Sequence, residues 1–182
     1  VFRDAEIRAA FLRHPAASGL HHAWRGGLAE HTLASAKTAE TFAKDRPFLN
    51  RDLLIAGILL HDLGKIEELD PGPGFQYTDA GRLCGHISLG AIMVEKKIRS
   101  LNDFPEKKRN LLLHMILSHH GSREMGSPVL PATPEAVALH HLECLDAKCQ
   151  GFQSEIERVK ESGQDSSWTD FTRIADGRIY TG

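Results

Sequence analysis

The chain has 182 residues, and its 22 basic and 24 acidic side chains give a formal net charge of −2. A chain of this length can bury a full core, so we expect one domain over residues 1–182. The charge argues against a dedicated nucleic-acid module, whose surface is strongly basic. No apolar run approaches the roughly 20 residues of a membrane span, and we expect neither a span nor a signal peptide.

Cysteine and histidine usage narrows the class of protein further. Cys84, Cys144 and Cys149 form no CxxC pair and leave an odd count, which argues against a disulfide framework and a thiolate zinc site. We therefore expect a reducing, cytoplasmic environment. Histidine is the unusual residue, because the chain has eleven and most of them lie in short clusters.

The first part of the chain predicts three helices. Apolar residues at helical spacing indicate a helix over residues 4–13, which ends before a proline. Residues 28–44 are rich in alanine and straight-chain side chains and predict a second helix, which carries His31. Asn50 is the expected N-cap of a third helix over residues 51–64, which is almost wholly apolar and therefore buried on most sides.

The rest of the chain predicts two loops, three more helices and a hairpin. Residues 70–85 are rich in glycine and proline and predict a loop, with a short hairpin as an option at FQYT. Two amphipathic helices are expected over residues 87–101 and 105–120. After a second loop of similar composition, Thr133 is the expected N-cap of a long helix through about residue 161. An Asp-Gly pair in the tail predicts a small C-terminal hairpin, so the predicted fold is all-α with this one addition.

Seven candidate metal ligands are distributed over separate predicted helices. They are His31, His61, Asp62, His86, His119, His120 and Asp146. Imidazole and carboxylate suit manganese, iron, nickel or zinc, and a helix bundle can bring such side chains together in one cavity. Asp62 ends an apolar helix, where a carboxylate is costly to bury unless it is paired or metal-bound.

These candidates suggest a site for one or two divalent ions, with Asp62 as the bridge. One ion would be held by His31, His61 and Asp146, and a second one by the three later histidines. If only one ion binds, the later histidines would contact phosphate instead. His114 is expected to face elsewhere, because it lies five positions before the final histidine pair on its helix. Two ions about 3.5–4 Å apart would support phosphoester hydrolysis, with Asp62 at its centre.

The ordered pattern His31, His61-Asp62 and Asp146 resembles the signature of the HD superfamily of metal-dependent phosphohydrolases. Six strings look like the HD domain of the YhaM-type 3′-5′ exoribonucleases: HHAWRGGLAEHT, HDLGKIEEL, GRLCGHISLG, LSHHG, GSPVLPATPEA and LDAK. The ending WTDF…GRIYTG fits as well, so the resemblance spans nearly the whole chain. No Gly-Tyr-Pro triplet follows the LSHHG string, which departs from the related cyclic-dinucleotide phosphodiesterases.

The resemblance implies an HD-domain helical bundle, with its core at about residues 20–150, and manganese-supported removal of nucleotides from an RNA 3′ end. It also implies an OB-fold domain that precedes the HD domain and grips single-stranded nucleic acid. The sequence predicts no OB-fold in this chain, which begins at Val1. A trimmed protein and a stand-alone relative both stay open, and the metal chemistry transfers better than the RNA specificity.

Further site residues are assigned by position. Lys65 lies one turn beyond Asp62 and could direct its ammonium at the scissile phosphate as a catalytic residue, or be a solvated helix-end cation. Arg82 and Arg123 are assigned to glycine-rich loops and could bind other phosphates, and His22 is a candidate substrate contact. The residues expected to orient the ligating histidines are Glu30, Glu67 and Glu143.

Three functions are compatible with the sequence. The first is a phosphodiesterase that acts on an RNA 3′ end or an oligonucleotide. The second is a nucleotidase or phosphomonoesterase that uses the same metals on small nucleotides. The third is a non-catalytic HD module that binds a nucleotide or a partner, which is disfavoured because all four positions of the HD pattern are filled.

Overall fold

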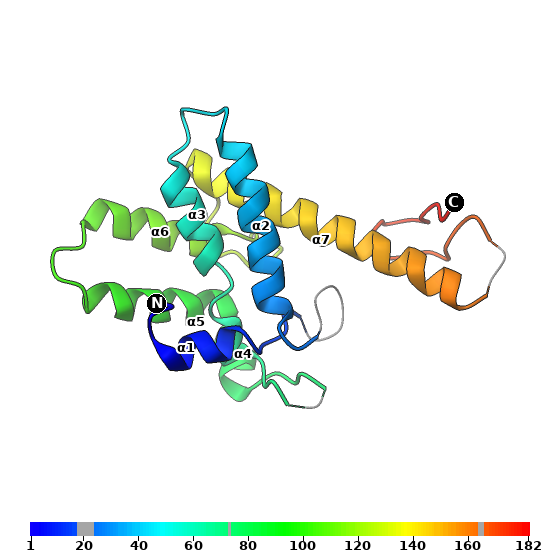
Figure 1. Ribbon diagram of the computed structural model, residues 1–182, viewed down its shortest axis with the longest axis horizontal. Coiled ribbons are helices and arrows are strands. Elements are labelled where there is room, and N and C mark those ends of the chain that lie inside the picture. The colour runs from blue at the N-terminus through cyan, green and yellow to red at the C-terminus, as the bar shows by residue number, and fades with distance from the viewer. Residues whose placement is uncertain (18–23, 73, 164–165) are drawn as a thin grey trace. The chain divides into compact units, whose positions relative to one another are not determined.

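A computed structural model describes residues 1–17, 24–72, 74–163 and 166–182, and these ranges form seven helices (Figure 1). The helices are α1 (Ala5–Phe11), α2 (Gly27–Ala43), α3 (Arg51–Leu60), α4 (Lys65–Glu68), α5 (Asp79–Arg99), α6 (Glu106–Ser118) and α7 (Pro134–Glu161). Pairing between extended segments is limited, in these ranges, to isolated antiparallel bridges. The all-α prediction is therefore confirmed.

Side-chain caps start several helices where the sequence predicts them. The Asn50 side chain accepts a hydrogen bond from the backbone N–H of Leu53 at the start of α3. The Thr133 hydroxyl oxygen accepts one from the N–H of Ala136 at the start of α7. Each cap satisfies one of the backbone donors that the first turn of a helix leaves without a carbonyl partner.

The third helix is shorter than predicted. It ends at Leu60, residues 61–64 form a turn, and α4 begins at Lys65, so Asp62 is in a turn and not in a helix. The His61 ring contributes to this change, because its Nδ1 atom lies 2.7 Å from the carbonyl oxygen of Ile58 and competes for a helical acceptor.

The predicted loop over residues 70–85 is wrong in its second half, because α5 begins at Asp79. The Thr78 hydroxyl accepts a hydrogen bond from the N–H of Gly81 and starts the helix. Gly85 then interrupts α5 with a non-helical backbone, at φ 69° and ψ 153°. In place of the optional hairpin, one antiparallel bridge joins Leu69 to Tyr77.

The chain divides into two compact units, Val1–Glu143 and Cys144–Gly182, and the boundary falls within α7. In the second unit, antiparallel bridges join Trp168 to Tyr180 and Thr172 to Gly177, so a small hairpin-like pairing forms where it was predicted, but its turn covers residues 173–176 and Gly177 is paired. None of the helices in the described ranges is both long and apolar enough to cross a membrane.

The first unit has two hydrophobic clusters, and α3 and α6 contribute to both. Leu54 and Ile58 of α3 and Met115 of α6 belong to one cluster, which also includes the first turns of α7. The other cluster joins α1, α2, α3, α5 and α6, and in Figure 1 α5 and α6 run side by side. Because both hydrophobic clusters contain side chains of α3 and α6, these two helices are fixed in place, and so are the residues that directly follow them.

Candidate metal centre

The candidate site begins directly after α3, where His61 and Asp62 are both buried. Two residues later α5 packs so closely on Gly64 that a Cβ atom there would collide with the carbonyl oxygen of His86. A glycine is therefore required for this approach. The approach brings Nε2 of His86 to 3.5 Å from Oδ1 of Asp62.

Three side chains gather on the Oδ2 side of Asp62, and we call His31, His61 and Glu143 the first cluster. They come from α2, from the turn after α3 and from α7. Nε2 of His31 lies 2.6 Å from Oε2 of Glu143, and Nε2 of His61 lies 3.3 Å from the same oxygen. Oδ2 of Asp62 lies 3.3 Å from Nε2 of His61 and 2.6 Å from Nζ of Lys65.

Three more histidines gather on the Oδ1 side of Asp62, and we call His86, His119 and His120 the second cluster. His86 belongs to α5, and the other two directly follow α6. One ring nitrogen from each lies within 4.8 Å of the other two. Nε2 of His119 is 3.7 Å from Oδ1 of Asp62, so one carboxylate faces both clusters with different oxygens.

Hydrogen bonds at Nδ1 orient these rings. In His61 and in His119, Nδ1 lies 2.7 Å from the carbonyl oxygen three residues earlier, and Nδ1 of His120 lies 2.7 Å from the carbonyl oxygen of Met125. A carbonyl oxygen only accepts, so Nδ1 is the donor in each ring. In a neutral ring this leaves Nε2 with a lone pair for a metal ion.

The first cluster consists of charges that compensate one another. Burial opposes the charged form of Asp62, but Lys65 and His61 together lower its pKa well below the usual range. Burial also opposes the charge on Glu143, and His61 and His31 lower the pKa of that carboxyl. Burial would lower the pKa of His61, yet the two carboxylates of Glu143 and Asp62 raise it well above its usual value.

In the second cluster, burial disfavours the charged form of two rings, and several buried polar atoms of the described residues lack a hydrogen-bond partner. Burial is the main reason why the pKa values of His119 and His120 are lowered. Among the residues that the structure describes, Asp62 Oδ1, His86 Nε2 and His119 Nε2 are buried without a hydrogen-bond partner. Such atoms are costly and rare. Two imidazole nitrogens and one carboxylate oxygen fit the ligand preference of a divalent transition metal.

The structure brings six of the seven predicted metal ligands together, five of them in the two clusters and Asp62 between them. They are His31, His61, Asp62, His86, His119 and His120. Asp146 lies further along α7, in the unit of residues 144–182, and its role as a ligand stays a prediction. His22 lies outside the described residues. His114 accepts a hydrogen bond at Nε2 from the backbone N–H of Ala132, which confirms that it faces elsewhere.

The two arginines assigned to phosphate binding are both exposed. Arg82 lies in the first turn of α5 and not in a loop, and its guanidinium carbon is 5.7 Å from the ring centroid of Tyr77. Arg123 lies in the loop after α6, as predicted. Their contacts with substrate stay predictions.

Two of the acidic residues expected to orient the histidines lie in different surroundings. Glu143 contacts His31 and His61, and it also belongs to the first cluster as a possible ligand. Glu67 is exposed, whereas its neighbour Glu68 is buried and its Oε1 atom lies 3.0 Å from Nδ1 of His86. The turn over residues 61–64 changes the helical phase, so the sequence offered no signal for choosing between the two adjacent glutamates.

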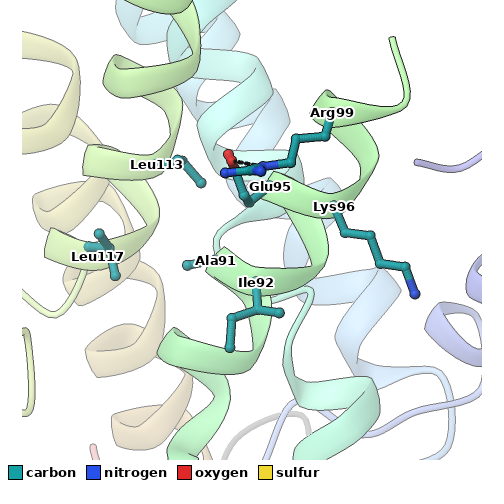
Figure 2. A pocket seen from close by; sticks show the side chains of 7 residues that line it. All are labelled: Ala91, Ile92, Glu95, Lys96, Arg99, Leu113 and Leu117. Atoms are coloured by element: carbon teal, nitrogen blue, oxygen red, sulfur yellow. Dashed lines mark hydrogen bonds and ion pairs between the residues drawn. The ribbon is translucent and has the colours of Figure 1, made fainter.

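An open groove between α5 and α6 is separate from this site (Figure 2). Its lining residues are Ala91, Ile92, Glu95, Lys96, Arg99, Leu113 and Leu117, and none of them belongs to either cluster. Figure 2 shows the ion pair between Glu95 and Arg99 at one edge. The groove is formed by helix packing and offers no metal ligands beyond this paired carboxylate.

Comparisons with known proteins agree with this geometry. Residues 28–148 match the family described as HD domain. The chain is 43% identical over 152 residues to a protein of Bacillus subtilis named 3′-5′ exoribonuclease YhaM, which covers 84% of this chain and 48% of that protein. A protein of the same name from Halalkalibacterium halodurans is 39% identical over 173 residues, covering 94% of this chain and 52% of that protein.

These relatives are longer than the chain. The chain spans about half the length of the curated relatives it matches. No solved structure gives a significant match. The family assignment therefore rests on sequence, and the geometry of Asp62 between two histidine clusters is an independent observation.

Proposed function

This chain belongs to the HD domain family, and from that premise we propose that it is a metal-dependent phosphodiester hydrolase. We further propose that it acts like a 3′-5′ exoribonuclease on single-stranded RNA or oligonucleotides, which is the activity that the relatives' names state. The observation that carries the proposal is Asp62, whose two carboxylate oxygens face two separate histidine clusters.

We propose one ion position at each cluster, with Asp62 as a ligand in both. The first cluster and Asp146 are the proposed ligands of one ion, and the second cluster is the proposed ligand set of the other. Manganese is the proposed metal, with iron, nickel and zinc as alternatives of the same ligand preference. Divalent cations held there would supply charge neutralisation at the phosphoryl oxygens and lower the pKa of an attacking water.

Other side chains would bind and orient the substrate. Lys65 is proposed as a catalytic residue that holds the scissile phosphate, because its ammonium lies 2.6 Å from Asp62 and its side chain is 18% exposed. It therefore reaches both the buried carboxylate and solvent. Arg82 and Arg123 are proposed contacts for neighbouring phosphates, because both are exposed cations. His22 is also a proposed substrate contact, and this proposal is based on the sequence alone.

RNA binding would need more surface than this chain provides. The net charge of −2 supplies no general attraction for a polyanion. We propose that an OB-fold domain N-terminal to the HD domain supplies the stacking platform and basic groove, because the chain matches only about half of its relatives' length. A cytoplasmic location is proposed with this function.

The proposal is tested with a 5′-labelled single-stranded oligoribonucleotide and added Mn²⁺. The expected product is a ladder that shortens from the 3′ end. Asp62→Asn should reduce the rate by more than about 100-fold, because loss of an orienting partner alone costs roughly 10–100-fold in metal affinity or activity. Asp52→Asn is the matched control, since Asp52 is an exposed aspartate at the start of α3.

Each other result changes the proposal in a defined way. Release of phosphate from nucleoside monophosphates, with no shortening of the oligonucleotide, would replace the exoribonuclease with a nucleotidase. Metal binding without either activity would favour a non-catalytic module. A protein that binds no divalent metal by elemental analysis, when purified without chelator, would contradict the proposal as a whole.

A further inference from the structure

His86 differs from the other histidines of the site in what holds its ring. His61 and His119 follow helices, where unpaired backbone carbonyls are available, and their Nδ1 atoms donate to such carbonyls. His86 directly follows Gly85, the residue that interrupts α5, and so begins a new helical segment. The first N–H groups of a helical segment lack a carbonyl partner within that segment. The backbone N–H of His86 therefore needs an acceptor from another part of the chain.

Glu68 is that acceptor, and it serves His86 twice. Its Oε1 atom accepts a hydrogen bond from the backbone N–H of His86 at 2.9 Å and lies 3.0 Å from Nδ1 of the same residue. The first contact caps the helical segment after Gly85. The second fixes the ring, because a carboxylate oxygen only accepts and Nδ1 must carry the proton. In a neutral ring this leaves Nε2 with a lone pair, 3.5 Å from Oδ1 of Asp62.

The backbone around Glu68 is held as firmly as its side chain. Glu68 is 7% exposed, and its carbonyl oxygen accepts a hydrogen bond from the N–H of Thr78 at 2.9 Å. Gly81 packs on the same carbonyl so closely that a Cβ atom would collide with it. The first part of α5 thus positions Glu68, and Glu68 positions the residue that begins the second part.

We propose that Glu68 is a positioning residue for metal binding, which holds His86 in the tautomer and orientation that present Nε2 beside Oδ1 of Asp62. This inference rests on the proposed metal-dependent function. Among the described residues, Glu68 contacts His86 of the second cluster and no member of the first, so its loss should weaken the ion at the second cluster and leave the first cluster intact. A residue with a merely structural role would alter protein stability without changing the tautomer of one ring.

The test measures the ring directly, in protein freed of metal by a chelator. Long-range ¹H–¹⁵N NMR spectra distinguish the two tautomers, and the His86 signals are identified by their loss in His86→Ala. The wild-type ring should carry its proton on Nδ1, and Glu68→Ala should shift protons to Nε2. Glu68→Gln should keep most of the wild-type tautomer, since the amide oxygen still accepts, and it serves if the alanine variant fails to fold. Glu67→Ala is the matched control on the exposed neighbour.

Metal binding is then measured by titration of the same proteins with Mn²⁺. Glu68→Ala should weaken the ion at the second cluster by about 10- to 100-fold, whereas Glu67→Ala should bind like wild type. An unchanged tautomer in Glu68→Ala, or an altered tautomer with unchanged affinity, would overturn the inference. A wild-type protein that binds no Mn²⁺ would contradict the proposed function instead, and the tautomer measurement separates these two failures.

Discussion

The two clusters around Asp62 solve the problem of burying polar groups in opposite ways. In the first cluster, Lys65 and Glu143 supply charges that pair with Asp62 and with the two histidines. In the second cluster the rings are held from behind at Nδ1, while Nε2 of His119 and Oδ1 of Asp62 have no hydrogen-bond partner among the described residues. The first cluster is held mainly by its own charges, although Oε1 of Glu143 is also buried without a partner among the described residues, and the second cluster relies on ring orientation and leaves more atoms for a ligand.

This difference indicates how the two sides would respond to a metal ion. An ion at the first cluster must replace existing ion pairs, which include the contact of Lys65 with Asp62 at 2.6 Å. An ion at the second cluster meets buried lone pairs that are already oriented and unpaired. We therefore expect the second cluster to bind without rearranging its contacts, and the first cluster to exchange a proton or a cation on binding.

The largest expected effect comes from removing one ligand on each side. His119→Ala should weaken binding at the second cluster by more than about 100-fold, and His31→Ala should do the same at the first, because ligands matter more than the partners that orient them. Titration of chelator-treated protein with Mn²⁺ measures both. His114→Ala is the control, since His114 is bonded to Ala132 outside the site. Equal loss of all metal in both variants would show that the clusters do not bind independently.

The next largest difference is expected in the number of protons that each cluster releases when it binds a metal ion. The raised pKa of His61 means that metal-free protein holds this proton at pH 7, so binding at the first cluster should release about one proton. The pKa values of His119 and His120 are lowered, mainly by burial, so these two rings should release no proton when the second cluster binds an ion. Calorimetry in two buffers of different ionisation enthalpy measures this, with His119→Ala and His31→Ala isolating each side.

The same shifts set the stability of the metal-free protein, with opposite signs. His61 has a folded pKa above the unfolded value near 6.5, so its contribution is present below about pH 6.5 and lost as pH rises through the folded pKa. His119 and His120 have lowered values, so the unfolded chain takes up their protons first and stability falls as pH drops below about 6.5. If both clusters released the same number of protons on binding metal, this assignment of a charged His61 and a neutral His119 would be contradicted.

Most of the helices and ligands could be predicted because local signals carry them. Asn50 and Thr133 cap their helices as predicted, since a capping side chain bonds only to the next turn. Six candidate ligands that lie together in the structure were predicted from histidines and one aspartate placed on helices that a bundle brings together.

The residues that sequence reasoning missed depend on contacts between distant segments. Gly85 was assigned to a loop, yet it divides one helix in two and so makes Glu68 necessary to His86. Nothing within a few residues of Glu68 indicates a partner 18 positions away. The glycine at position 64 is required by the backbone of α5 and not by its own turn. Such requirements become visible only when the helices are packed.

A moderate effect is expected at Gly121, which follows the second cluster. Gly121 has φ +80°, and a Cβ atom there would collide with the ring of His140, whose Nδ1 lies 3.0 Å from the carbonyl oxygen of His119. Gly121→Ala should lower the free energy of unfolding by about 2–5 kcal/mol, as left-handed strain of roughly 1–2 kcal/mol and overpacking of roughly 1–3 kcal/mol add. Chemical denaturation of metal-free protein measures it.

Gly126→Ala is the matched control for that substitution. Gly126 has φ +95°, but the nearest atom to a Cβ there is Nδ1 of His120 at 3.9 Å, so only the strain applies. Its cost should be about 1–2 kcal/mol. Equal losses in the two variants would mean that the His140 ring moves aside freely and does not hold the backbone of the second cluster.

The smallest effect is expected at a partly exposed ion-pair network outside the buried site. Glu95 of α5 joins Arg109 of α6 and Arg99 of its own helix, at 2.6 Å in each case, and these arginines lower its pKa to about 2. The pKa of the unfolded group is near 4.5, so the contribution is present above about pH 4.5 and lost as pH falls toward 2. Glu95→Gln should therefore lower the melting temperature slightly at pH 7 and not at pH 2. Because solvent-accessible pairs are screened, 1 M salt should also reduce the difference, whereas it should leave metal binding at the buried Asp62 largely unchanged.

Glu155→Gln, which breaks a pair with Arg158 within one helix, is the control and should change the melting temperature less. A difference for Glu95→Gln that persists in high salt would mean that this surface pair behaves like the buried site and that exposure does not separate the two.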